Sequence, residues 1–432
     1  MHNLNLLFLV RRWRDGDVDA LDITELLRRA RRCKATDPRD NLFALYGVTL
    51  TDLNLIGLTA DYHSSTTDVY REAAFKLLCG SSRLDILETP RGYSDLRTSL
   101  PSWVPDWSDN SVLPVSLTHR YEEGISMSKT SMRPMMIDAI KAQGLSDEDI
   151  AEIDIEAHLS ETLEEISEEN NQFLGTNVKF YAAASSLRSP PSLGEDGRSL
   201  ITSGHIIDKV SVIGQKLEAP EFDQEKLAAR LDEAIKFSTN MKSVGGFFSK
   251  MRQYVRTLME WEDIATKNQP EKYVNGELRK TVYWKVLCGG YVPDGEEESE
   301  NGFKTLKSQL RGAMAIQKLN PHNHDSPGIL TMLSLIFGGK YAVFRGKHPR
   351  KFATLMEVSL ERKLMRTSKG YLGLAPADTK EGDIIVILKG RRMPFVMRSR
   401  GGPWELIGPC YLHGIMHGEA FDEDSCGEVR IV

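Results

Sequence analysis

The chain has 432 residues, and its 55 Lys and Arg residues against 61 Asp and Glu residues give a net charge of −6. Hydrophobic residues make up 41% and charged residues 27% of the chain, which is ordinary globular usage and excludes a wholly disordered or collagen-like protein. The slightly acidic balance gives no reason to expect nucleic-acid binding. At roughly 150 residues per domain, the length predicts about two or three domains.

The cysteines and the first residues of the chain indicate the cellular compartment of the protein. Five Cys residues without a Cys-x-x-Cys pair do not form a disulfide framework, so a reduced, cytoplasmic protein is expected. The apolar run 6–10 precedes its basic residues, unlike a signal peptide, and no run reaches the roughly 20 apolar residues that span a bilayer. A core-like segment directly after Met1 suggests that an upstream segment is missing.

Helices are predicted near the start of the chain, over residues 18–34, 41–48 and 66–79. The basic residues that end the first helix form either an anion-binding patch or a solvated end that suits the helix dipole, and we favour the solvated end. Asp37 before Pro38 is typical of a helix start, and Thr67 is expected to cap the helix over 66–79. Residues 84–87 are typical of a short strand.

Two polar and aromatic clusters have alternative interpretations. Trp103, Asp106 and Trp107 form either a ligand-facing platform or a corner that anchors the core, with the carboxylate accepting an N–H group. The prolines that flank them favour the corner. Asp37 and its neighbours Arg39 and Asp40 form either a binding site or an Arg–carboxylate clamp that fixes the start of a helix.

The middle of the chain contains an acidic tract over residues 146–170, which has eleven Asp or Glu residues and no Lys or Arg. It is either a metal-binding or partner-binding helix or, as we favour, a solvated helix or mobile insertion. The remaining expectations for this part are a loop over 188–198, a strand pair within 200–212 that turns at Ser203-Gly204, helices over 223–266, 305–319 and 329–337, and an acidic loop over 296–301.

Short β-type runs follow near the C-terminus. They lie at 371–374, 383–388, 395–398, 404–407 and 420–421, with Gly and Pro between them. This density of strands predicts a small barrel or curled sheet over about 366–425.

No motif identifies an active site from the residues alone. His413 and His417 have the spacing of zinc ligands on a helix, but Gly414 and Gly418 argue against a helix there. The pair at His322 and His324 is a weaker candidate for a metal site. Phosphate-loop, dinucleotide-binding and Gly-x-Ser-x-Gly motifs are absent from the sequence. Basic residues cluster at 345–351 and 389–400. Because stacking aromatics are sparse near them, we favour a solvated rim of the expected barrel over a site that binds an anion or RNA. No cofactor is expected.

An ordered set of motifs resembles the fungal heterokaryon incompatibility (HET) domain family. Residues 32–47 resemble the third conserved region of these domains. The other matching positions follow in family order over nearly the whole chain. The residues that carry the resemblance are Asp37, Pro38, Arg39, Asp40, Asp61, Tyr62, Val69, Tyr70, Trp103, Pro105, Asp106, Trp107, residues 180–184, 204–210, 283–287 and 370–376, Gly382, Asp383, residues 394–397, Arg398, Tyr411, His413, Gly414, Gly418 and Glu419.

The resemblance implies a TIR-like α/β fold for the HET domain, with its candidate catalytic carboxylate in a front half whose Ala-Leu-Ser-Tyr-x-Trp-Gly and Trp-Ile-Asp-x-x-Cys-Ile-Asn-Gln segments are not found here. It therefore implies a truncated, non-catalytic protein of self/non-self recognition, programmed cell death or innate immunity, with protein partners. In this interpretation the motif residues are structural. The chain acts as a regulator or a remnant.

We accordingly expect an α+β protein with four segments. These are a partial α/β remnant of the HET domain over 1–115, an acidic helical insertion and linker over 116–199, a mostly helical middle over 200–365 and a small β-barrel over 366–432. One alternative is an enzyme with an unrecognised site in the C-terminal half, around Asp383, His413 and Glu419, with or without a metal near His413. The other is a decaying gene product or a misassigned start.

Overall fold

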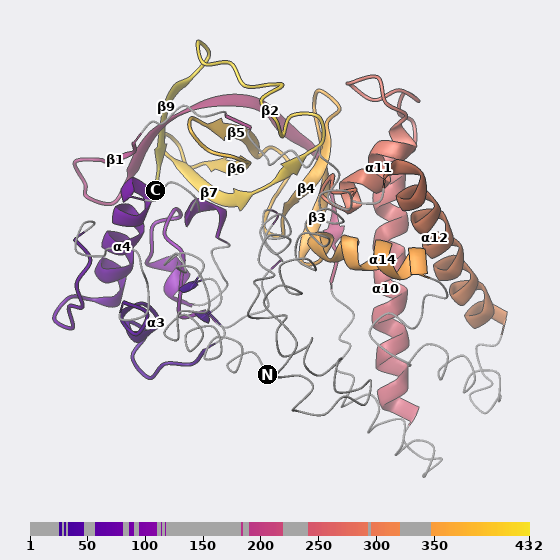
Figure 1. Ribbon diagram of the computed structural model, residues 1–432, viewed down its shortest axis with the longest axis horizontal. Coiled ribbons are helices and arrows are strands. Elements are labelled where there is room, and N and C mark those ends of the chain that lie inside the picture. The colour runs from indigo at the N-terminus through magenta and orange to yellow at the C-terminus, as the bar shows by residue number, and fades with distance from the viewer. Residues whose placement is uncertain are drawn as a thin grey trace, which may run out of the picture. The chain divides into compact units, whose positions relative to one another are not determined.

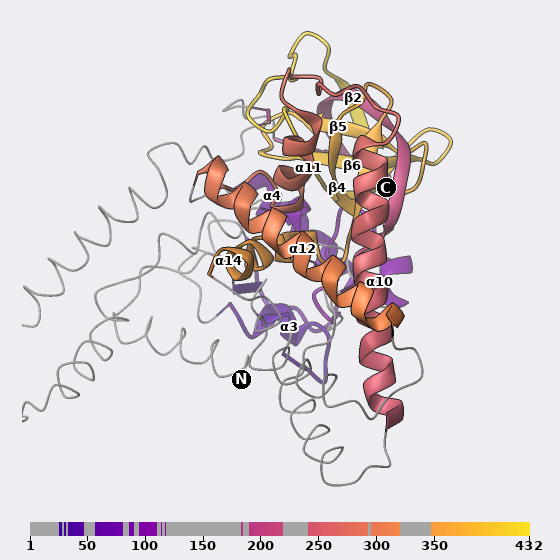
Figure 2. The same cartoon turned by 90° about the vertical axis from the view of Figure 1, so that its right-hand side faces the viewer.

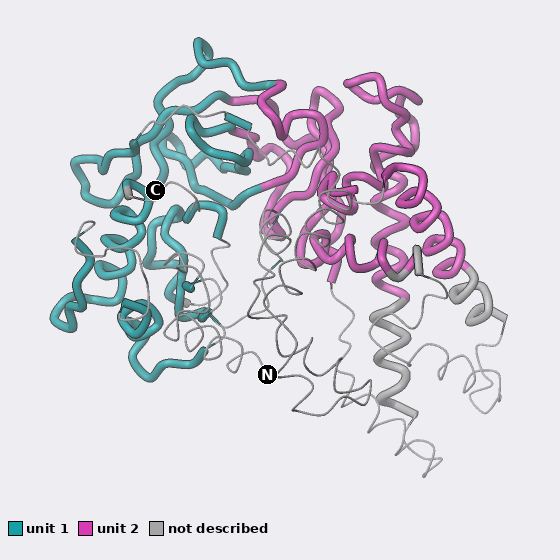
Figure 3. Tube along the Cα trace, viewed as in Figure 1, with its two compact units in different colours: residues 1–205, 387–409, 420–432 teal, residues 206–386, 410–419 magenta. Residues whose placement is uncertain are grey.

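The computed structural model describes residues 26–27, 30–31, 33–46, 57–80, 86–89, 95–109, 114, 117, 183–184, 190–218, 241–292, 295–319 and 347–432. These residues mix helices with a largely C-terminal sheet, which confirms the α+β class (Figure 1). The chain divides into two compact units (Figure 3): unit 1 holds residues 1–205, 387–409 and 420–432, and unit 2 holds residues 206–386 and 410–419. The expected division into four segments stays a prediction.

In unit 1, helix α4 (Thr66–Gly80) has the buried face that its sequence period predicts. The buried side chains of this face are Val69, Tyr70, Ala73, Ala74, Leu77 and Leu78. The capping residue is Ser65 instead of Thr67, because the Ser65 hydroxyl accepts the N–H of Asp68 and donates to its carboxylate.

Other helical segments of unit 1 are short. Helix α3 covers only Asp40–Phe43, so the helix expected over 41–48 ends early in turns that reach Tyr46. The 3₁₀ helices are η1 (Ile86–Glu88) and η2 (Asp95–Thr98). The strand expected over 84–87 is therefore wrong in its described part, where Ile86 and Leu87 are buried by a helical turn.

The strands of unit 1 pair mainly antiparallel. The first part of β2 (Leu200–Lys216) pairs with β1 (Ser192–Leu193) and with β9 (Gly427–Ile431), while β6 (Pro394–Ser399) pairs with β7 (Trp404–Pro409). The link from β7 to β9 is parallel. Strand β9 was not predicted, although its alternating exposed and buried residues have the period of a strand.

The strand pair expected within 200–212 is wrong, because β2 is one continuous strand and Ser203-Gly204 is not a turn. Ser203 lies opposite Glu428, and Gly204 lies opposite Gly427. The Ser203 carbonyl also accepts the N–H of Lys389. With partners on both sides, the backbone stays extended through this polar dipeptide.

The strands of unit 2 continue from β2. Strand β3 (Arg362–Thr367) pairs with the second part of β2 and with β4 (Leu372–Pro376), which pairs with β8 (Tyr411–Leu412). Strand β5 (Ile384–Leu388) also pairs with β2, so the path β5-β6-β7-β9-β2 returns to β5. Strand β3 was not predicted. The residues expected to form a strand at 420–421 lie in a turn instead.

Four helices are described in unit 2, and the first two of them lie beside strands β3 and β4 (Figures 1 and 2). They are α10 (Met241–Thr266), α11 (Arg279–Leu287), α12 (Glu296–Leu319) and α14 (Lys347–Leu355), which continues into the 3₁₀ helix η3 (Met356–Ser359). The rings of Trp284, Phe303 and Phe352 join α11, α12 and α14, with Phe303 and Phe352 5.5 Å apart at their centroids.

The contact between β2 and α10 requires a glycine. A Cβ atom at Gly214 would lie 2.8 Å from the indole of Trp261, and the Trp261 Nε1 donates to the carbonyl of Gln215. Only glycine lets the strand approach the helix this closely. Trp261 is fully buried, so the contact fixes which side of α10 faces the strands.

The acidic loop expected over 296–301 is the start of α12 instead. Glu296, Glu297 and Glu298 lie in the first turn of this helix, where the positive end of the helix dipole favours carboxylates. The acidic tract over 146–170 and the helix expected over 329–337 lie outside the described residues. No helix within the described ranges is long and apolar enough to cross a membrane.

Candidate functional site

The motif Asp37-Pro38-Arg39-Asp40 forms a clamp in unit 1. Both carboxylate oxygens of Asp37 accept hydrogen bonds from the Arg39 side chain, at 2.7 and 3.0 Å, and one also accepts the Arg39 backbone N–H. These hydrogen bonds lower the pKa of Asp37 below its ordinary value. The same guanidinium donates to the carbonyls of Tyr62 and Ser64. The geometry is that of the expected Arg–carboxylate clamp.

Two tyrosines complete the clamp. Tyr62 donates from its hydroxyl to Asp40 at 2.6 Å and stacks below the Arg39 guanidinium, 5.4 Å from the ring centroid. Tyr70 of α4 donates to the carbonyl of Pro38 at 2.5 Å. The clamp therefore ties the start of α3 to α4 and to the segment before it.

The Trp103–Trp107 segment is a core corner in unit 1. Only 1% of Trp103 and 2% of Trp107 is exposed, so neither indole offers a platform to a ligand. Trp103 Nε1 donates to the carbonyl of Arg198, and Trp107 packs edge-on against Tyr70 at 4.9 Å. The Ser102 hydroxyl accepts the N–H of Leu406, and this bond attaches the corner to β7.

The Asp106 carboxylate accepts hydrogen bonds within the corner. Pro105 and Asp106 are both buried, and the Asp106 carboxylate accepts the N–H and hydroxyl of Ser108 at 2.9 and 2.6 Å. Arg31 is also buried, and desolvation lowers its pKa to about 10 against the attraction of Asp109 and Asp106. Arg31 is thus not part of a solvated basic helix end, which corrects the expectation for that residue.

Gly382 and Asp383 form the turn that begins β5. Gly382 has a φ of 91°, a left-handed conformation that favours glycine. The Val210 backbone donates to the carbonyl of Asp383 and accepts from Gly382, which attaches the turn to β2. The buried Asp383 carboxylate accepts the N–H of Lys380. Arg398 lies on β6 opposite Glu405 of β7.

The richest polar cluster surrounds His413 in unit 2, and we refer to Tyr411, His413, Glu277 and Lys285 as the His413 cluster. His413 Nε2 lies 2.9 Å from a Glu277 oxygen, and His413 Nδ1 lies 2.8 Å from the Tyr411 hydroxyl. A neutral imidazole satisfies both contacts at once, by donating to Glu277 and accepting from Tyr411. The His413 side chain is only 11% exposed.

Lys285 extends the cluster toward α12. Its ammonium group lies 2.6 Å from Glu277 and 2.6 Å from Glu296. The hydrogen bond from His413, followed by that from Lys285, lowers the pKa of Glu277 well below its ordinary value, against the opposing effect of desolvation. Glu277 is therefore a carboxylate at neutral pH, held by His413, Lys285 and Asn275.

Backbone contacts hold His413 in place. The Tyr273 hydroxyl accepts the N–H of Leu372 and donates to the carbonyl of His413, while the His413 N–H donates to the carbonyl of Leu372. Two glycines make room around the cluster. A Cβ atom at Gly290 would lie 2.4 Å from the Tyr411 hydroxyl, and Gly414 turns the chain after His413 with a φ of 88°.

The second histidine of the zinc-like spacing, His417, does not belong to the His413 cluster. His417 is exposed, and its backbone N–H donates to the Glu419 carboxylate at 2.7 Å, next to Gly418. Across the described part of the chain, no group of three or more His, Cys, Asp or Glu side chains could hold a metal ion. His413 is thus coupled to Glu277, a partner that sequence reasoning missed because it lies 136 residues away.

Comparisons with known proteins give two matches. Residues 344–429 match the family model of the Het-6 beta-barrel domain. The chain is 22% identical, over 416 residues, to a Neurospora crassa protein named heterokaryon incompatibility protein 6, OR allele. This alignment covers 90% of the chain but 49% of the relative, so the chain spans about half the length of that protein. No solved structure matches.

Proposed function

Because this chain is related to the fungal heterokaryon incompatibility proteins, a resemblance that both comparisons confirm, we propose that it acts in self/non-self recognition between fungal cells. In this proposal the chain is a non-catalytic regulator that binds other incompatibility proteins in the cytoplasm. Its binding alters programmed cell death or a related innate immune response.

The observation that carries the non-catalytic role is the way the motif side chains are used. Trp103 and Trp107 are buried, Arg39 is held by Asp37, and His413 lies between Tyr411 and Glu277. Each of these groups is engaged in contacts within the chain. Such contacts support a role in maintaining the fold, and they leave recognition to other, exposed side chains.

The finer aspects of the fold belong to the same proposal. The return of the strand path from β2 to β5 supports a closed barrel as the structure of the C-terminal region. The clamp and α4 are proposed to be part of a TIR-like α/β remnant, on the basis of the motif resemblance.

Coexpression tests the function directly. The chain is expressed in fungal strains that carry different incompatibility genotypes, alongside an intact relative, and growth and cell death are scored. We expect the chain to change the response in at least one genotype. The Trp103→Ala variant, which loses a core side chain, serves as the destabilised control. An unchanged response in every genotype, together with no binding to any intact relative, would contradict the proposal.

A second candidate function is an enzyme that uses the His413 cluster. The specific observation in its favour is an imidazole within hydrogen-bond distance of both a carboxylate and a phenol, an arrangement that orients a general base. This candidate requires that His413→Gln abolish the cellular response while the protein remains folded. The non-catalytic proposal requires that the response persist.

A further inference from the structure

A short hairpin connects α10 to α11 in unit 2. Lys272 lies opposite Leu278 in an antiparallel bridge, backbone hydrogen bonds flank the bridge on either side, and Gly276 turns the chain with a φ of 90°. Figure 1 shows this connection at the upper end of α10, where it extends beyond the helix. The bridge determines which side chains of the hairpin share a face.

The inward side of the hairpin is attached to the rest of unit 2. Tyr273 is 4% and Arg279 is 5% exposed. The Tyr273 hydroxyl bonds to the backbone of Leu372 and His413, and the Arg279 guanidinium lies over the Tyr273 ring, 5.4 Å from its centroid. These contacts hold the hairpin in one orientation against β4.

The outward side carries two aliphatic side chains that are flanked in sequence by lysines. Successive residues of a strand alternate between its faces, so Lys272 and Val274 lie opposite the side of Tyr273, and the bridge places Leu278 beside Lys272. Val274 is 50% and Leu278 is 55% exposed, and both lysines are exposed as well. We refer to Lys272, Val274, Leu278 and Lys280 as the hairpin face.

The hairpin face is cationic. No carboxylate of the described residues forms an ion pair with Lys272 or Lys280. Glu271 is exposed beside Lys272, whereas Glu277 is engaged in the His413 cluster. The outward charge of the hairpin is therefore positive.

A third lysine adjoins the hairpin face. Lys369 precedes Gly370 in the turn between β3 and β4, and a Cβ atom at Gly370 would lie 3.8 Å from a methyl group of Val274. Lys369 is exposed, and its ammonium group donates to the carbonyl of Ile207 at 2.8 Å. Because this acceptor is neutral, the contact does not compensate the charge of Lys369.

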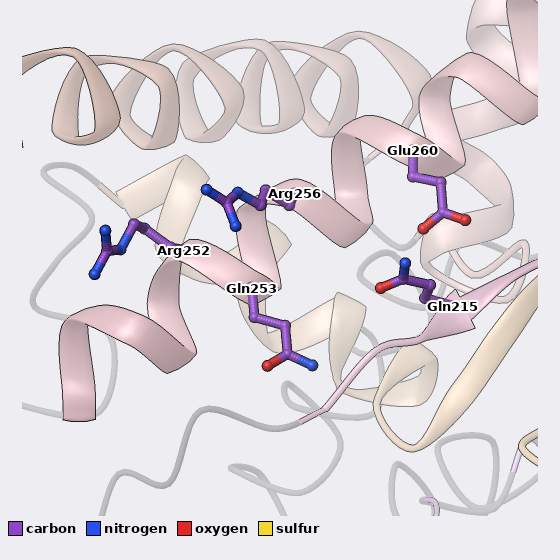
Figure 4. Close-up of a pocket in the computed structure, with 5 residues that line it drawn as sticks. All are labelled: Gln215, Arg252, Gln253, Arg256 and Glu260. Carbon is purple, nitrogen blue, oxygen red and sulfur yellow. The ribbon is translucent and has the colours of Figure 1, made fainter. Parts of the chain in front are cut away.

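The polar depression along α10 differs from the hairpin face. Figure 4 shows Gln215 and Glu260 of this depression facing each other, with Arg252 and Arg256 on the same helix. Arg252 already takes part in an interaction within the chain, and Glu260 adds a carboxylate. The described lining residues of the depression include no aliphatic side chain, whereas the hairpin face combines aliphatic groups with cations.

We infer that the hairpin face binds the surface of a bilayer that contains anionic lipids. Exposed aliphatic side chains enter the boundary between headgroups and acyl chains, and neighbouring lysines are attracted to anionic headgroups. The long stem of a lysine lets its ammonium group stay among the headgroups while the aliphatic groups lie deeper. Val274 and Leu278 are the side chains that enter, and the three lysines surround them.

The composition of the face favours lipid over other anionic partners. Protein interfaces take most of their binding energy from Trp, Tyr and Arg, and lysine is depleted in them. Single-stranded nucleic acids stack on exposed aromatic rings, whereas the ring of the hairpin, Tyr273, is buried. The net charge of −6 for the whole chain opposes a general attraction to anionic lipid, so binding depends on this local face.

Lipid binding goes beyond the proposed recognition function, because it concerns where the chain is held and not which protein it recognises. Binding is measured by co-sedimentation of the purified full chain with vesicles of phosphatidylcholine and phosphatidylserine in equal parts. Vesicles of phosphatidylcholine alone are the matched ligand. Since no cellular response is involved, the outcome is separate from that of the coexpression experiment.

Two variants test the two components of the face. Val274→Ser/Leu278→Ser removes the aliphatic groups, and Lys272→Gln/Lys280→Gln removes the charges. All four side chains are exposed, and serine at position 278 suits the N-cap of α11. Circular dichroism checks that both variants are folded.

Matched controls make comparable changes elsewhere in the chain. Leu193→Ser/Met259→Gln removes aliphatic groups that are 36% and 45% exposed. Lys34→Gln/Lys304→Gln removes two exposed lysine charges.

We expect the wild-type chain and both controls to bind the phosphatidylserine vesicles, and each hairpin variant to bind about tenfold or more weakly. Binding should weaken as salt is added. No binding by the wild type, or equal losses in the controls, overturns the inference. Full binding by the serine variant would show charge attraction without insertion. Complete competition by inorganic phosphate at constant ionic strength would show a small-anion site, and binding to a peptide of alternating Glu and Ala but not to vesicles would show a protein partner. Each of these results also overturns the inference.

Discussion

The Trp103–Trp107 corner of unit 1 and the His413 cluster of unit 2 both bury motif side chains, but the corner buries large indoles whereas the cluster is built from polar groups. Both join distant segments: Trp103 donates to the Arg198 carbonyl, 95 residues away, and His413 contacts Glu277 across 136 residues. Removal of an indole from the corner therefore costs apolar burial and packing, whereas removal of a side chain from the cluster costs hydrogen bonds. The His413 cluster forms only when the helices and strands of unit 2 have packed, so it reports on the tertiary fold.

The largest effect should come from the corner. Trp103→Ala removes a fully buried indole and should reduce the free energy of unfolding by about 3–5 kcal/mol. Denaturation by urea, followed by circular dichroism, measures the loss. Trp103→Phe keeps an aromatic ring but loses the hydrogen bond to the Arg198 carbonyl, so it should lose less. A Trp103→Ala protein as stable as wild type would mean that the corner does not anchor the core.

Gly290 tests the packing of the His413 cluster through its backbone. Gly290→Ala adds a methyl group 2.4 Å from the Tyr411 hydroxyl, at a φ of 74°. The left-handed strain and the clash together should cost about 3 kcal/mol. Gly276→Ala is the matched control, because its φ is 90° but its methyl group meets nothing within 4 Å. Equal losses of stability in the two variants would show that the space around Tyr411 does not matter.

Removal of the imidazole should have an intermediate effect. His413→Ala leaves the Glu277 carboxylate and the Tyr411 hydroxyl without this partner, which should cost about 1–3 kcal/mol. In a double-mutant cycle with Glu277→Gln, the losses should not add, because the two residues share one hydrogen bond. Glu419→Gln, which affects only an exposed local contact, should be nearly neutral. Strictly additive losses would show that the contact contributes nothing.

The smallest effect should appear as a pH dependence. The folded-state pKa of Glu277 is lowered, so its ionised form stabilises the folded chain above its unfolded pKa of about 4.3, and this contribution is lost as the pH falls through the lowered folded value. The stability difference between wild type and Glu277→Gln should therefore be constant near neutral pH and shrink below about pH 4. A difference that grows on acidification would contradict this assignment.

The sequence predicted those features whose causes are local. The buried face of α4 follows from side-chain period, and the corner follows from prolines that flank two indoles. Features that depend on contacts with distant segments of the chain were predicted wrongly or not predicted. Ser203-Gly204 has the composition of a turn, but its partners at Glu428 and Gly427 hold it in a strand. One feature with a local cause was also predicted wrongly: the acidic residues from Glu296 were expected to form a loop, although carboxylates suit a helix start.

The same division holds for the candidate sites. The clamp residues Asp37 and Arg39 are two apart, so their pairing could be predicted. Glu277 and Lys285 carry no signal in the sequence that links them to His413.

The central claim is that the motif side chains maintain the fold and do not perform chemistry. The most direct test is the incompatibility response of a strain that expresses His413→Gln, measured beside the amount of folded protein. Gln retains hydrogen-bonding groups but cannot act as a general base near neutral pH. The account predicts a response that follows the amount of folded protein. A fully folded His413→Gln protein with no response would contradict it and would place chemistry at the His413 cluster.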